Sequence, residues 1–238
     1  MPLPPFHWWR TVFWLIPAIS VYTVVLGCLS LASSLVDRSG NAAHRCARAW
    51  SRLILLTTGV RVRVDGLDKL PRAEACVFVA NHQSIYDIPI LFWALPFQLR
   101  IIAKASLGRF PVLGWHLRCT GHLLVERERT GAATLKHAAA MAAGGRSLIV
   151  FPEGTRSRDG RVGPFKRGLF LMAIEAGLPV VPVSVAGSRH VMLKGRLMTC
   201  PGDVDVVVHE PIPTRGMSRA GARSLADRAR GIVEREAA

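Results

Sequence analysis

The sequence predicts an α/β domain, a layered sheet with flanking helices, that follows an N-terminal membrane helix or two-helix hairpin. Two observations support this fold class: an uncharged apolar run near the amino terminus, and short β-branched runs that alternate with helical stretches after residue 60. The 238 residues suffice to bury roughly 70–75% of the surface of the unfolded chain. We therefore expect membrane-anchoring helices in residues 1–59 and the α/β domain in residues 60–238.

The first element is a membrane segment, because no charged residue occurs over the 26 positions from Thr11 to Val36. A helix needs about 20 residues to cross the hydrocarbon core of a bilayer. A cleaved signal peptide is the alternative, but only Arg10 precedes the run, which is also longer than the apolar region of such a peptide. The sequence therefore favours a retained anchor, in which Pro17 and Gly27 would permit a bend.

A second helix is expected at residues 43–59, where arginines at helical spacing stand beside Trp50 and three leucines. Such a helix would lie at the membrane interface or fold back, so a full span and a hairpin in one leaflet both remain open. Arg10 alone precedes the apolar run, whereas six arginines follow it: Arg38, Arg45, Arg48, Arg52, Arg61 and Arg63. This bias places the α/β domain on the cytoplasmic side of the cytoplasmic membrane, against the lipids of the inner leaflet.

The α/β domain is expected to contain seven strands, and its helices to include four. The strands are β-branched or apolar runs, at Val60–Val64, Ala75–Ala80, Gln98–Ala103, His122–Glu126, Ser147–Phe151, Val180–Val185 and Val204–His209. The helices are expected at Ser84–Ala94, Ala132–Ala143, Lys166–Ala176 and Ser218–Glu236. No glycine pattern reads G-x-G-x-x-G or G-x-x-x-x-G-K-S/T, so a nucleotide-binding fold is not supported.

The chain is strongly basic, with 31 Lys and Arg against 16 Asp and Glu and a net charge of +15. A field of this sign attracts nucleic acid, anionic lipid surfaces or phosphorylated substrates. The arginines are scattered, and neither a Lys/Arg run nor a zinc module occurs, so we expect a lipid partner and no nucleic acid. The five cysteines are odd in number and widely spaced, which predicts reduced thiols and neither a disulfide framework nor a structural metal.

The stretch "ANHQSIYDIPI", residues 80–90, places His82 five positions before Asp87, where an expected strand gives way to a helix. One interpretation is structural: Ser84 and Asp87 resemble a capping box, and the helix dipole favours an aspartate in the first turn. The other is catalytic, because a carboxylate that reaches the imidazole would fix its tautomer and stabilise the imidazolium ion. His82 has no comparable structural task there. We expect no functional role for the other histidines, and none of them belongs to a set with metal-ligand spacing.

The stretch "VFPEGTRSRDGRVGPFKRG", residues 150–168, follows another apolar strand. Pro152 and Gly154 predict a turn that presents a carboxylate, a hydroxyl and a guanidinium. The forked side chain of Arg156, with Thr155 and backbone N–H groups, suits a phosphate, and three further basic residues would add positive charge. The alternative is a basic loop that is simply exposed to solvent.

Together the two stretches resemble blocks of the lysophospholipid acyltransferase family. Residues 81–87, "NHQSIYD", are similar to its H-x-x-x-x-D block in the form that acts on lysophosphatidic acid, and residues 151–157 are similar to its F-P-E-G-T-R-S block. Residues 121–127, "GHLLVER", resemble the second block and residues 178–183, "LPVVPV", the last. The four blocks occur in family order after the membrane segment. The second departs mildly, because Val and Glu stand ahead of Arg127.

The resemblance implies a glycerolphosphate acyltransferase-like fold and a reaction. An acyl group would pass from acyl-CoA or acyl carrier protein to the free hydroxyl of 1-acyl-sn-glycerol-3-phosphate, giving phosphatidic acid in phospholipid biosynthesis. His82 and Asp87 would be the catalytic residues, and no metal and no cofactor besides the acyl donor is implied. The site for the phosphate of the acceptor would consist of Glu153, Gly154, Thr155, Arg156, Lys104 and Arg127.

The chemistry agrees with this assignment. An alcohol is a poor nucleophile near neutral pH, so a positioned base such as His82 is worth about 10²–10⁴ in rate. No cysteine stands in a motif that would supply a covalent intermediate, so we expect direct attack in a ternary complex. Lys104 and backbone N–H groups at residues 84–87 are candidates to stabilise the oxyanion. The segment Leu107–Trp115 would dock on lipid, line an acyl groove or form a buried core helix.

Three alternatives remain open from the sequence. Within the family, the acceptor could be glycerol-3-phosphate, a lyso-aminolipid or another lysophospholipid. A non-catalytic basic protein of the lipid surface is a second alternative, although it would have no reason to keep both the His82–Asp87 pair and the block at residues 151–157. A histidine-dependent hydrolase of thioesters is the third.

Overall fold

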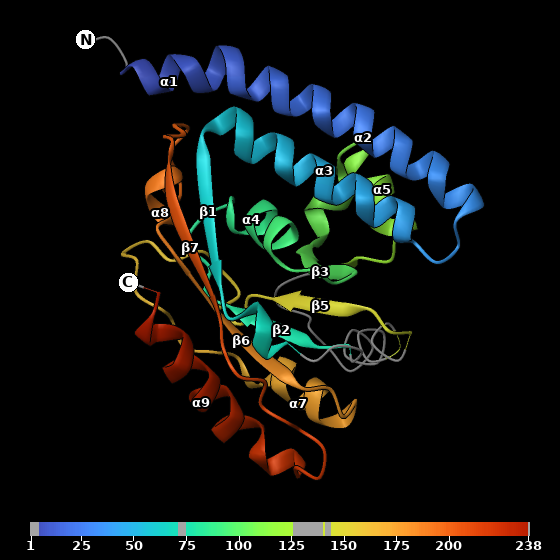
Figure 1. Ribbon diagram of the computed structural model, residues 1–238, viewed down its shortest axis with the longest axis vertical. Helices are drawn as coiled ribbons and strands as arrows, with labels where there is room; N and C mark the ends of the chain where they lie inside the picture. Colours follow the sequence, from blue (N-terminus) through green and yellow to red (C-terminus); the bar gives the residue numbers. More distant parts are fainter. Residues whose placement is uncertain (1–4, 71–74, 126–139, 141–143, 238) are drawn as a thin grey trace.

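The chain begins with one long helical rod that lies over the rest of the molecule (Figure 1). The computed structural model describes residues 5–70, 75–125, 140 and 144–237, with the backbone alone for Lys104. The rod consists of α1 (Phe6–Arg10), a π-helical turn (Thr11–Leu15) and α2 (Ile16–Val36). By length and composition, the 31 residues from Phe6 to Val36 could cross a membrane, and only 6% of their apolar stretch is buried.

The second amino-terminal helix, α3 (Asn41–Thr58), returns antiparallel to α2, so the structure contains the helix pair that the sequence left as one alternative. The indole of Trp50 donates to the hydroxyl of Thr23 at 3.0 Å. At the start of the rod, the guanidinium of Arg10 donates to the carbonyl of Thr58 at 2.7 Å. Ser30, near its other end, is hydrogen-bonded to His116 at 2.8 Å. The rod is therefore attached to the rest of the molecule near both ends.

A seven-stranded mixed sheet forms the centre of the molecule, in the order β1-β7-β6-β2-β5-β3-β4. Its strands are β1 (Val60–Asp65), β2 (Val77–Ala80), β3 (Leu99–Lys104), β4 (Leu123–Val125), β5 (Ser147–Val150), β6 (Val180–Ala186) and β7 (Gly202–Val208). Neighbouring strands run parallel, except that β6 and β7 are antiparallel. Because β2, β5 and β6 are covered on both faces, they read as continuous apolar runs in the sequence.

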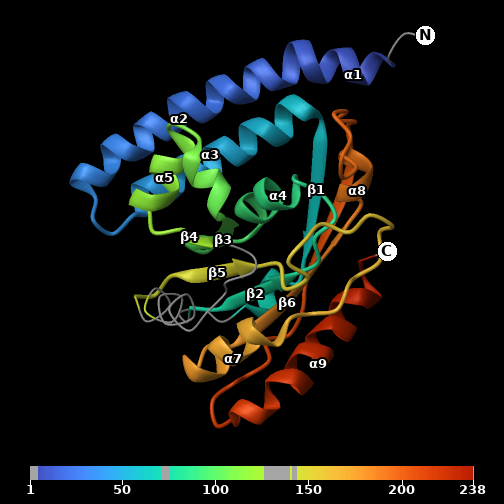
Figure 2. The same ribbon diagram turned by 180° about the vertical axis from the view of Figure 1, so that it is seen from behind.

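Helices cover both faces of the sheet (Figures 1 and 2). One face carries α3, α4 (Asp87–Ala94) and α5 (Leu113–Cys119), with the rod above them; the other carries α7 (Arg167–Glu175) and α9 (Ala222–Arg235). Strand β2 illustrates the division, because Phe78 and Ala80 point into the first core while Val77 and Val79 point into the second. Short helical segments lie at Leu67–Lys69, Ala105–Arg109, Ser188–Val191 (α8) and Arg219–Gly221.

The predicted fold class is confirmed, and each of the seven expected strands occurs within two residues of its predicted ends. The helices expected at Lys166–Ala176 and Ser218–Glu236 are α7 and the segment that ends with α9. The helix predicted at Ser84–Ala94 begins only at Asp87, because the residues before it form a loop around the Asp87 carboxylate. The helix predicted at Ala132–Ala143 lies, apart from Ala140, outside the described residues. The chain turns at Gly59 between α3 and β1, but the division into two domains at that point stays a prediction.

Candidate functional site

The site lies where parallel strands of the sheet end side by side. β2 ends at Ala80 and is followed by Asn81 and His82, and its neighbour β5 ends at Val150 and is followed by the stretch that contains Glu153. Asn81 anchors the first of these segments, because its amide donates to the carbonyl of Val185 and accepts from the N–H of the same residue, both at 2.8 Å. The carboxyl edge of a parallel sheet is a common place for ligands to bind.

His82 and Asp87 form a direct hydrogen bond, 2.7 Å from Nδ1 to Oδ2. The same oxygen of Asp87 also accepts the backbone N–H groups of Gln83 and Ser84, at 2.8 and 2.9 Å. An oxygen that receives two N–H donors acts as an acceptor toward the ring as well, so Nδ1 carries the proton of the neutral imidazole. The lone pair of that imidazole is therefore on Nε2, which has no hydrogen-bond partner among the described residues.

The surroundings hold both side chains in place. Asp87 is fully buried, and 13% of the His82 side chain is exposed. The imidazole stacks on the ring of Phe151, with the two centroids 4.1 Å apart and the planes inclined by 19°. Phe151 thus limits rotation of the imidazole while its edge stays accessible.

The capping-box interpretation is correct in part: the Ser84 hydroxyl accepts the N–H of Tyr86 at 3.4 Å, but the N–H of Asp87 donates to the backbone carbonyl of Ser84. The carboxylate of Asp87 accepts the N–H of Ser84, as in such a box, but the Ser84 hydroxyl donates to the carbonyl of Met192 at 3.0 Å. The residues from His82 to Tyr86 therefore form a loop around the carboxylate, which explains why α4 begins at Asp87 rather than at Ser84. The N–H groups of Ser84 and Asp87 already have acceptors, so these two were wrong as free donors for an oxyanion.

Glu153 joins the two segments of the site. One of its carboxylate oxygens accepts the backbone N–H of His82 at 2.8 Å, and the other accepts the N–H of Gly163 at 3.0 Å. The N–H of Ser157 in turn donates to the carbonyl of His82 at 2.7 Å. Burial raises the pKa of Glu153, whereas these two N–H donors lower it. A carboxylate that is engaged in this way positions the loop, so the expected contact between Glu153 and a phosphate is not what this geometry favours.

The turn at residues 154–156 gathers positive charge from three parts of the chain. Gly154 adopts a left-handed φ of 72°, and a Cβ there would lie 2.8 Å from Nζ of Lys166. Lys194 donates to the hydroxyl of Thr155 at 2.9 Å and to the carbonyl of Arg156 at 2.6 Å. Arg156 is half-buried, and its guanidinium makes no hydrogen bond or ion pair with another residue that the structure describes. The turn therefore offers an anion a free guanidinium beside two ammonium groups.

Two predicted site residues are not placed. Arg127 lies outside the described residues, and of Lys104 only the backbone, at the end of β3, is described. Conversely, sequence reasoning missed Lys194, which follows α8 and is separated from Thr155 by 39 positions. No motif surrounds Lys194, so the sequence contains no signal that would have identified it.

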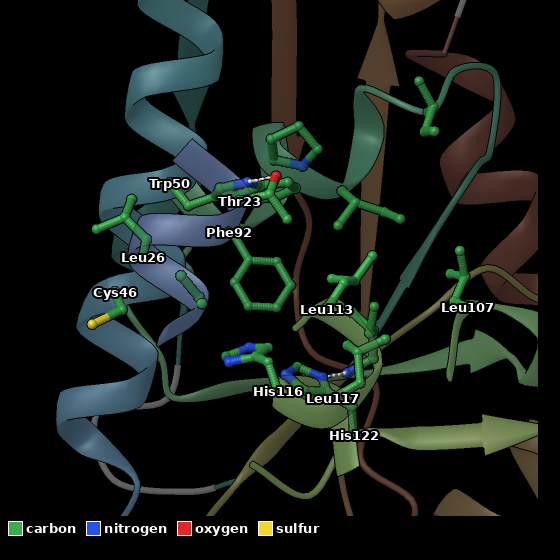
Figure 3. Close-up of a pocket in the computed structure, with 16 residues that line it drawn as sticks. Thr23, Leu26, Cys46, Trp50, Phe92, Leu107, Leu113, His116, Leu117 and His122 are labelled. Atoms are coloured by element: carbon green, nitrogen blue, oxygen red, sulfur yellow. Dashed lines mark hydrogen bonds between the residues drawn. The ribbon is translucent and has the colours of Figure 1, made fainter. Parts of the chain in front are cut away.

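An apolar cavity of about 230 Å³ lies between the helix pair and the first face of the sheet (Figure 3). Its walls come from α2, α3, α4, α5, strand β3 and the segments around Ile85, Leu107 and His122. It is lined by Thr23, Leu26, Gly27, Cys46, Ala47, Trp50, Ile85, Ile88, Pro89, Phe92, Ile101, Leu107, Leu113, His116, Leu117 and His122. Ile85 stands three residues after His82, so one part of the cavity adjoins the loop of the site. Phe110 and Trp115 are more than half exposed. The buried-core-helix alternative for Leu107–Trp115 was therefore wrong, because this segment lines the cavity and exposes two aromatic rings.

Three histidines lie in or beside the cavity. Burial, together with the positive charge of Arg100, lowers the pKa of His44 and His116 to about 4, and burial puts the pKa of His122 well below its usual range. Among the described residues, no group of three or more His, Cys, Asp or Glu is arranged to hold a metal ion.

A sheet of this order, with a histidine–aspartate pair at its carboxyl edge beside a cationic turn, defines an enzyme of the acyltransferase type. The sequence model of the family described as Acyltransferase matches residues 61–186, and the chain belongs to that family.

Two named proteins are similar to this chain over most of its length. A chloroplastic 1-acyl-sn-glycerol-3-phosphate acyltransferase, BAT2 of Brassica napus, is 36% identical over 173 residues, which are 71% of this chain and 50% of that protein. The human 1-acyl-sn-glycerol-3-phosphate acyltransferase alpha is 34% identical over 72% of this chain and 62% of its own. The chain thus spans about half to three fifths of the length of these relatives.

The fold is that of a solved structure. The crystal structure of the 1-acyl-sn-glycerophosphate (LPA) acyltransferase PlsC from Thermotoga maritima superposes with a TM-score of 0.79 at 29% identity. The match covers 93% of this chain and 94% of that one. The likeness therefore includes the amino-terminal helices as well as the sheet.

Proposed function

We propose that this protein transfers an acyl group from a thioester donor to the free hydroxyl of 1-acyl-sn-glycerol-3-phosphate and thereby forms phosphatidic acid. The observation that carries the proposal is the 2.7 Å hydrogen bond between His82 and Asp87, held by Glu153 beside the cationic turn. The names of the relatives support this acceptor. Acyl-CoA and acyl carrier protein are both suitable donors.

In this mechanism His82 is the general base. The hydroxyl oxygen of the acceptor attacks the carbonyl carbon of the thioester while its proton moves to Nε2 of His82. Asp87 keeps the proton on Nδ1 and stabilises the imidazolium ion that forms. The tetrahedral intermediate then collapses, the carbon–sulfur bond breaks, and the thiolate takes the proton from Nε2. Each atom and proton is thus accounted for without a covalent enzyme intermediate.

Arg156 would bind the phosphate of the acceptor. Its guanidinium is free among the described residues, and two parallel N–H donors match two phosphate oxygens. Lys166 and Lys194 add charge from either side of the turn. Thr155 and Gly154 contribute a hydroxyl and a backbone that can approach closely. Lys104 and Arg127 stay proposals from the family resemblance alone.

The cavity would hold an acyl chain. An apolar space of about 230 Å³ that adjoins Ile85 suits a chain whose reacting end lies at His82. Thr23, Leu26 and Gly27 belong to its wall, so the amino-terminal helix contributes to the site itself. A cleaved signal peptide would remove that wall, which supports the retained anchor.

The helix pair would embed in one leaflet rather than span the bilayer. Contacts of Arg10 and Ser30 with the rest of the molecule hold the rod alongside α3. The outward side chains of the rod include Phe13, Trp14 and Val21, all more than half exposed, and these suit the acyl region of a membrane. We place the sheet on the cytoplasmic side, since the arginines follow the apolar run.

The test is acyl transfer by the purified protein, with radiolabelled acyl-CoA and with acyl carrier protein, to lysophosphatidate, glycerol-3-phosphate and other lysolipids offered separately. Labelled phosphatidate that disappears in His82→Ala is the expected result. Label in a different product only would show that the acceptor is wrong. Free labelled fatty acid without transfer would identify a thioester hydrolase, and no product at all would contradict the proposed enzyme.

A further inference from the structure

The mostly apolar wall of the cavity includes Thr23 and Trp50, which are hydrogen-bonded to each other, and the thiol of Cys46. At one end two histidines lie next to each other. Figure 3 shows the rings of His116 and His122 as neighbours among aliphatic and aromatic side chains. Their centroids are 5.7 Å apart and their planes are inclined by 39°. A space meant only for methylene groups would not need polar rings in its wall, because a polar group without a partner costs free energy there.

The tautomer of His122 follows from one contact. Its Nδ1 lies 3.1 Å from the backbone nitrogen of Ile101, whose N–H can only donate. Nδ1 is therefore the acceptor, and the proton of the neutral ring is on Nε2. Burial of His122 holds its pKa well below the usual range, so the ring is neutral. Within the described part of the chain this N–H donor has no acceptor.

His116 presents a second polar atom. Its Nδ1 is hydrogen-bonded to the hydroxyl of Ser30 at 2.8 Å, which fixes the orientation of the ring. Its Nε2 likewise makes no hydrogen bond to a residue that the structure describes. Since burial also lowers its pKa, to about 4, this ring is neutral near pH 7. The two rings together offer one certain donor and, on His116, either an acceptor or a donor.

The pair is at the end of the cavity away from His82. Ile88, Pro89 and Phe92 line the cavity along α4, and Ile85 lines it from the loop that precedes this helix. Ile85 is next to the loop of His82, and the ring of Phe92 is 6.1 Å from that of His122. With a helical rise of about 1.5 Å per residue, Phe92 lies roughly 6 Å beyond Ile88 along the axis of α4. An acyl group that reacts at His82 would therefore reach the histidines with its middle or far carbons.

We propose that His116 and His122 form a polar recognition site which selects an acyl chain that carries a hydroxyl group over an unsubstituted chain of the same length. A hydroxyl group is both a donor and an acceptor, so it can receive the Nε2–H of His122 and bond to Nε2 of His116. A methylene group leaves both ring nitrogens without a partner. The inference rests on the proposed function, since it requires the cavity to hold an acyl chain.

The experiment compares kcat/KM for acyl chains of equal length that differ in one hydroxyl group. The probes are acyl-CoA esters with no hydroxyl, or with one next to the thioester, in the middle or at the end of the chain. A parallel series places the hydroxyl on the acyl chain of the lysophosphatidate instead. We expect one middle or terminal position, in one of the series, to be preferred by roughly two- to tenfold, the effect of one or two hydrogen bonds.

The decisive variant is His122→Asn. The carbonyl oxygen of asparagine can take the place of Nδ1 and accept the N–H of Ile101, but the shorter side chain has no group at the position of Nε2. The variant thus keeps the hydrogen bond to the N–H of Ile101 and lacks the Nε2–H donor. Within the variant, kcat/KM for the preferred hydroxylated probe should therefore fall to the value for the unsubstituted chain of the same length. His190→Asn changes an exposed histidine elsewhere and should leave the preference intact.

Two results would overturn the inference. One is a wild-type enzyme that uses unsubstituted chains at least as well as every hydroxylated probe, which would mean that the rings bind water only. The other is an unchanged preference in His122→Asn. Both leave transfer to lysophosphatidate in place, so they are distinct from failure of the proposed function, in which no probe of either series is transferred.

Discussion

At the residue scale, the arrangement of His82 is set by three different neighbours. Asp87 determines the tautomer, Phe151 supports the face of the ring, and Glu153 holds the backbone N–H. Only the first of these could be inferred from the spacing of a histidine and an aspartate. The other two come from the segment after β5, which the sequence indicated only as a separate motif. The two motifs therefore act as one structural unit.

The first prediction concerns this base. His82→Ala should lower kcat for acyl transfer by about 10²–10⁴, the contribution of a positioned general base, with little change in KM for the acceptor. Steady-state rates with acyl-CoA and lysophosphatidate measure both constants. Thermal unfolding of the variant and of His190→Ala serves as the control for folding. Wild-type kcat in His82→Ala would exclude the mechanism.

The second prediction concerns Lys194, which we expect to position the turn at residues 154–156 that we propose to bind the phosphate. Lys194→Met removes its bonds to Thr155 and to the carbonyl of Arg156, so the backbone that carries the Arg156 side chain is no longer held at these two points. KM for lysophosphatidate should rise by roughly tenfold, the effect of one or two charge-assisted hydrogen bonds, while kcat falls much less.

Arg196→Met is the matched control for this change. It removes the same charge two residues away, at an exposed position of the same turn. If both variants raised KM equally, Lys194 would act through net charge alone and not through the contacts with the turn. If neither raised it, the positioning role would be wrong.

At the scale of elements, the strands were easier to predict than the start of α4. Runs such as Val180–Ala186 are buried on both faces, so their side chains alone reveal them. The start of α4 depends on one carboxylate, because Asp87 takes the N–H groups that a helix beginning at Ser84 would leave free. Lys194 could not be predicted at all, since its contact with Thr155 depends on how α8 is oriented. Residue spacing therefore predicts contacts between residues that are close in the sequence. Contacts between distant segments depend on how the fold brings those segments together.

The third prediction concerns the outward face of α2. Val21 and Val25 are 58% and 51% exposed. Replacing both with aspartate should greatly weaken binding to vesicles of anionic phospholipid, because two carboxylates would have to enter the acyl region. Sedimentation of the protein with vesicles measures the bound fraction.

The control for this prediction adds the same charge on the other side of the sheet. Ser218, which precedes α9, and Ser224, which lies in α9, are both exposed. Figure 1 shows α9 across the sheet from the rod. Ser218→Asp with Ser224→Asp also adds two negative charges, so it reproduces any general effect of net charge. Equal loss of binding in the two double variants would show that α2 is not the membrane-embedded element.

At the scale of the whole molecule, the fold packs a long apolar helix directly against the rest of an enzyme. The cavity has α2 and α3 on one side and α4 and α5 on the other, so it exists only while the helix pair is in contact with the sheet domain. Polar side chains lie at this junction, where Arg100 is buried and His44 and His116 are half-buried. The stability of the junction should therefore depend on the charge of its histidines.

The fourth prediction is that the folded protein loses stability as pH falls from about 6.5 toward 4. The pKa of both His44 and His116 is about 4 in the folded state, because burial and the charge of Arg100 oppose protonation, and near 6.5 when unfolded. In this range the unfolded chain binds more protons, so acid favours unfolding. Both ring nitrogens of His44 are buried. His44→Gln should therefore give a smaller fall of Tm between pH 6.5 and 4 in detergent solution, because glutamine cannot take up a proton. His190→Gln changes an exposed histidine and should show the same fall of Tm as the wild type. Parallel curves for His44→Gln and wild type would show that protonation at this junction does not govern the acid stability of the fold.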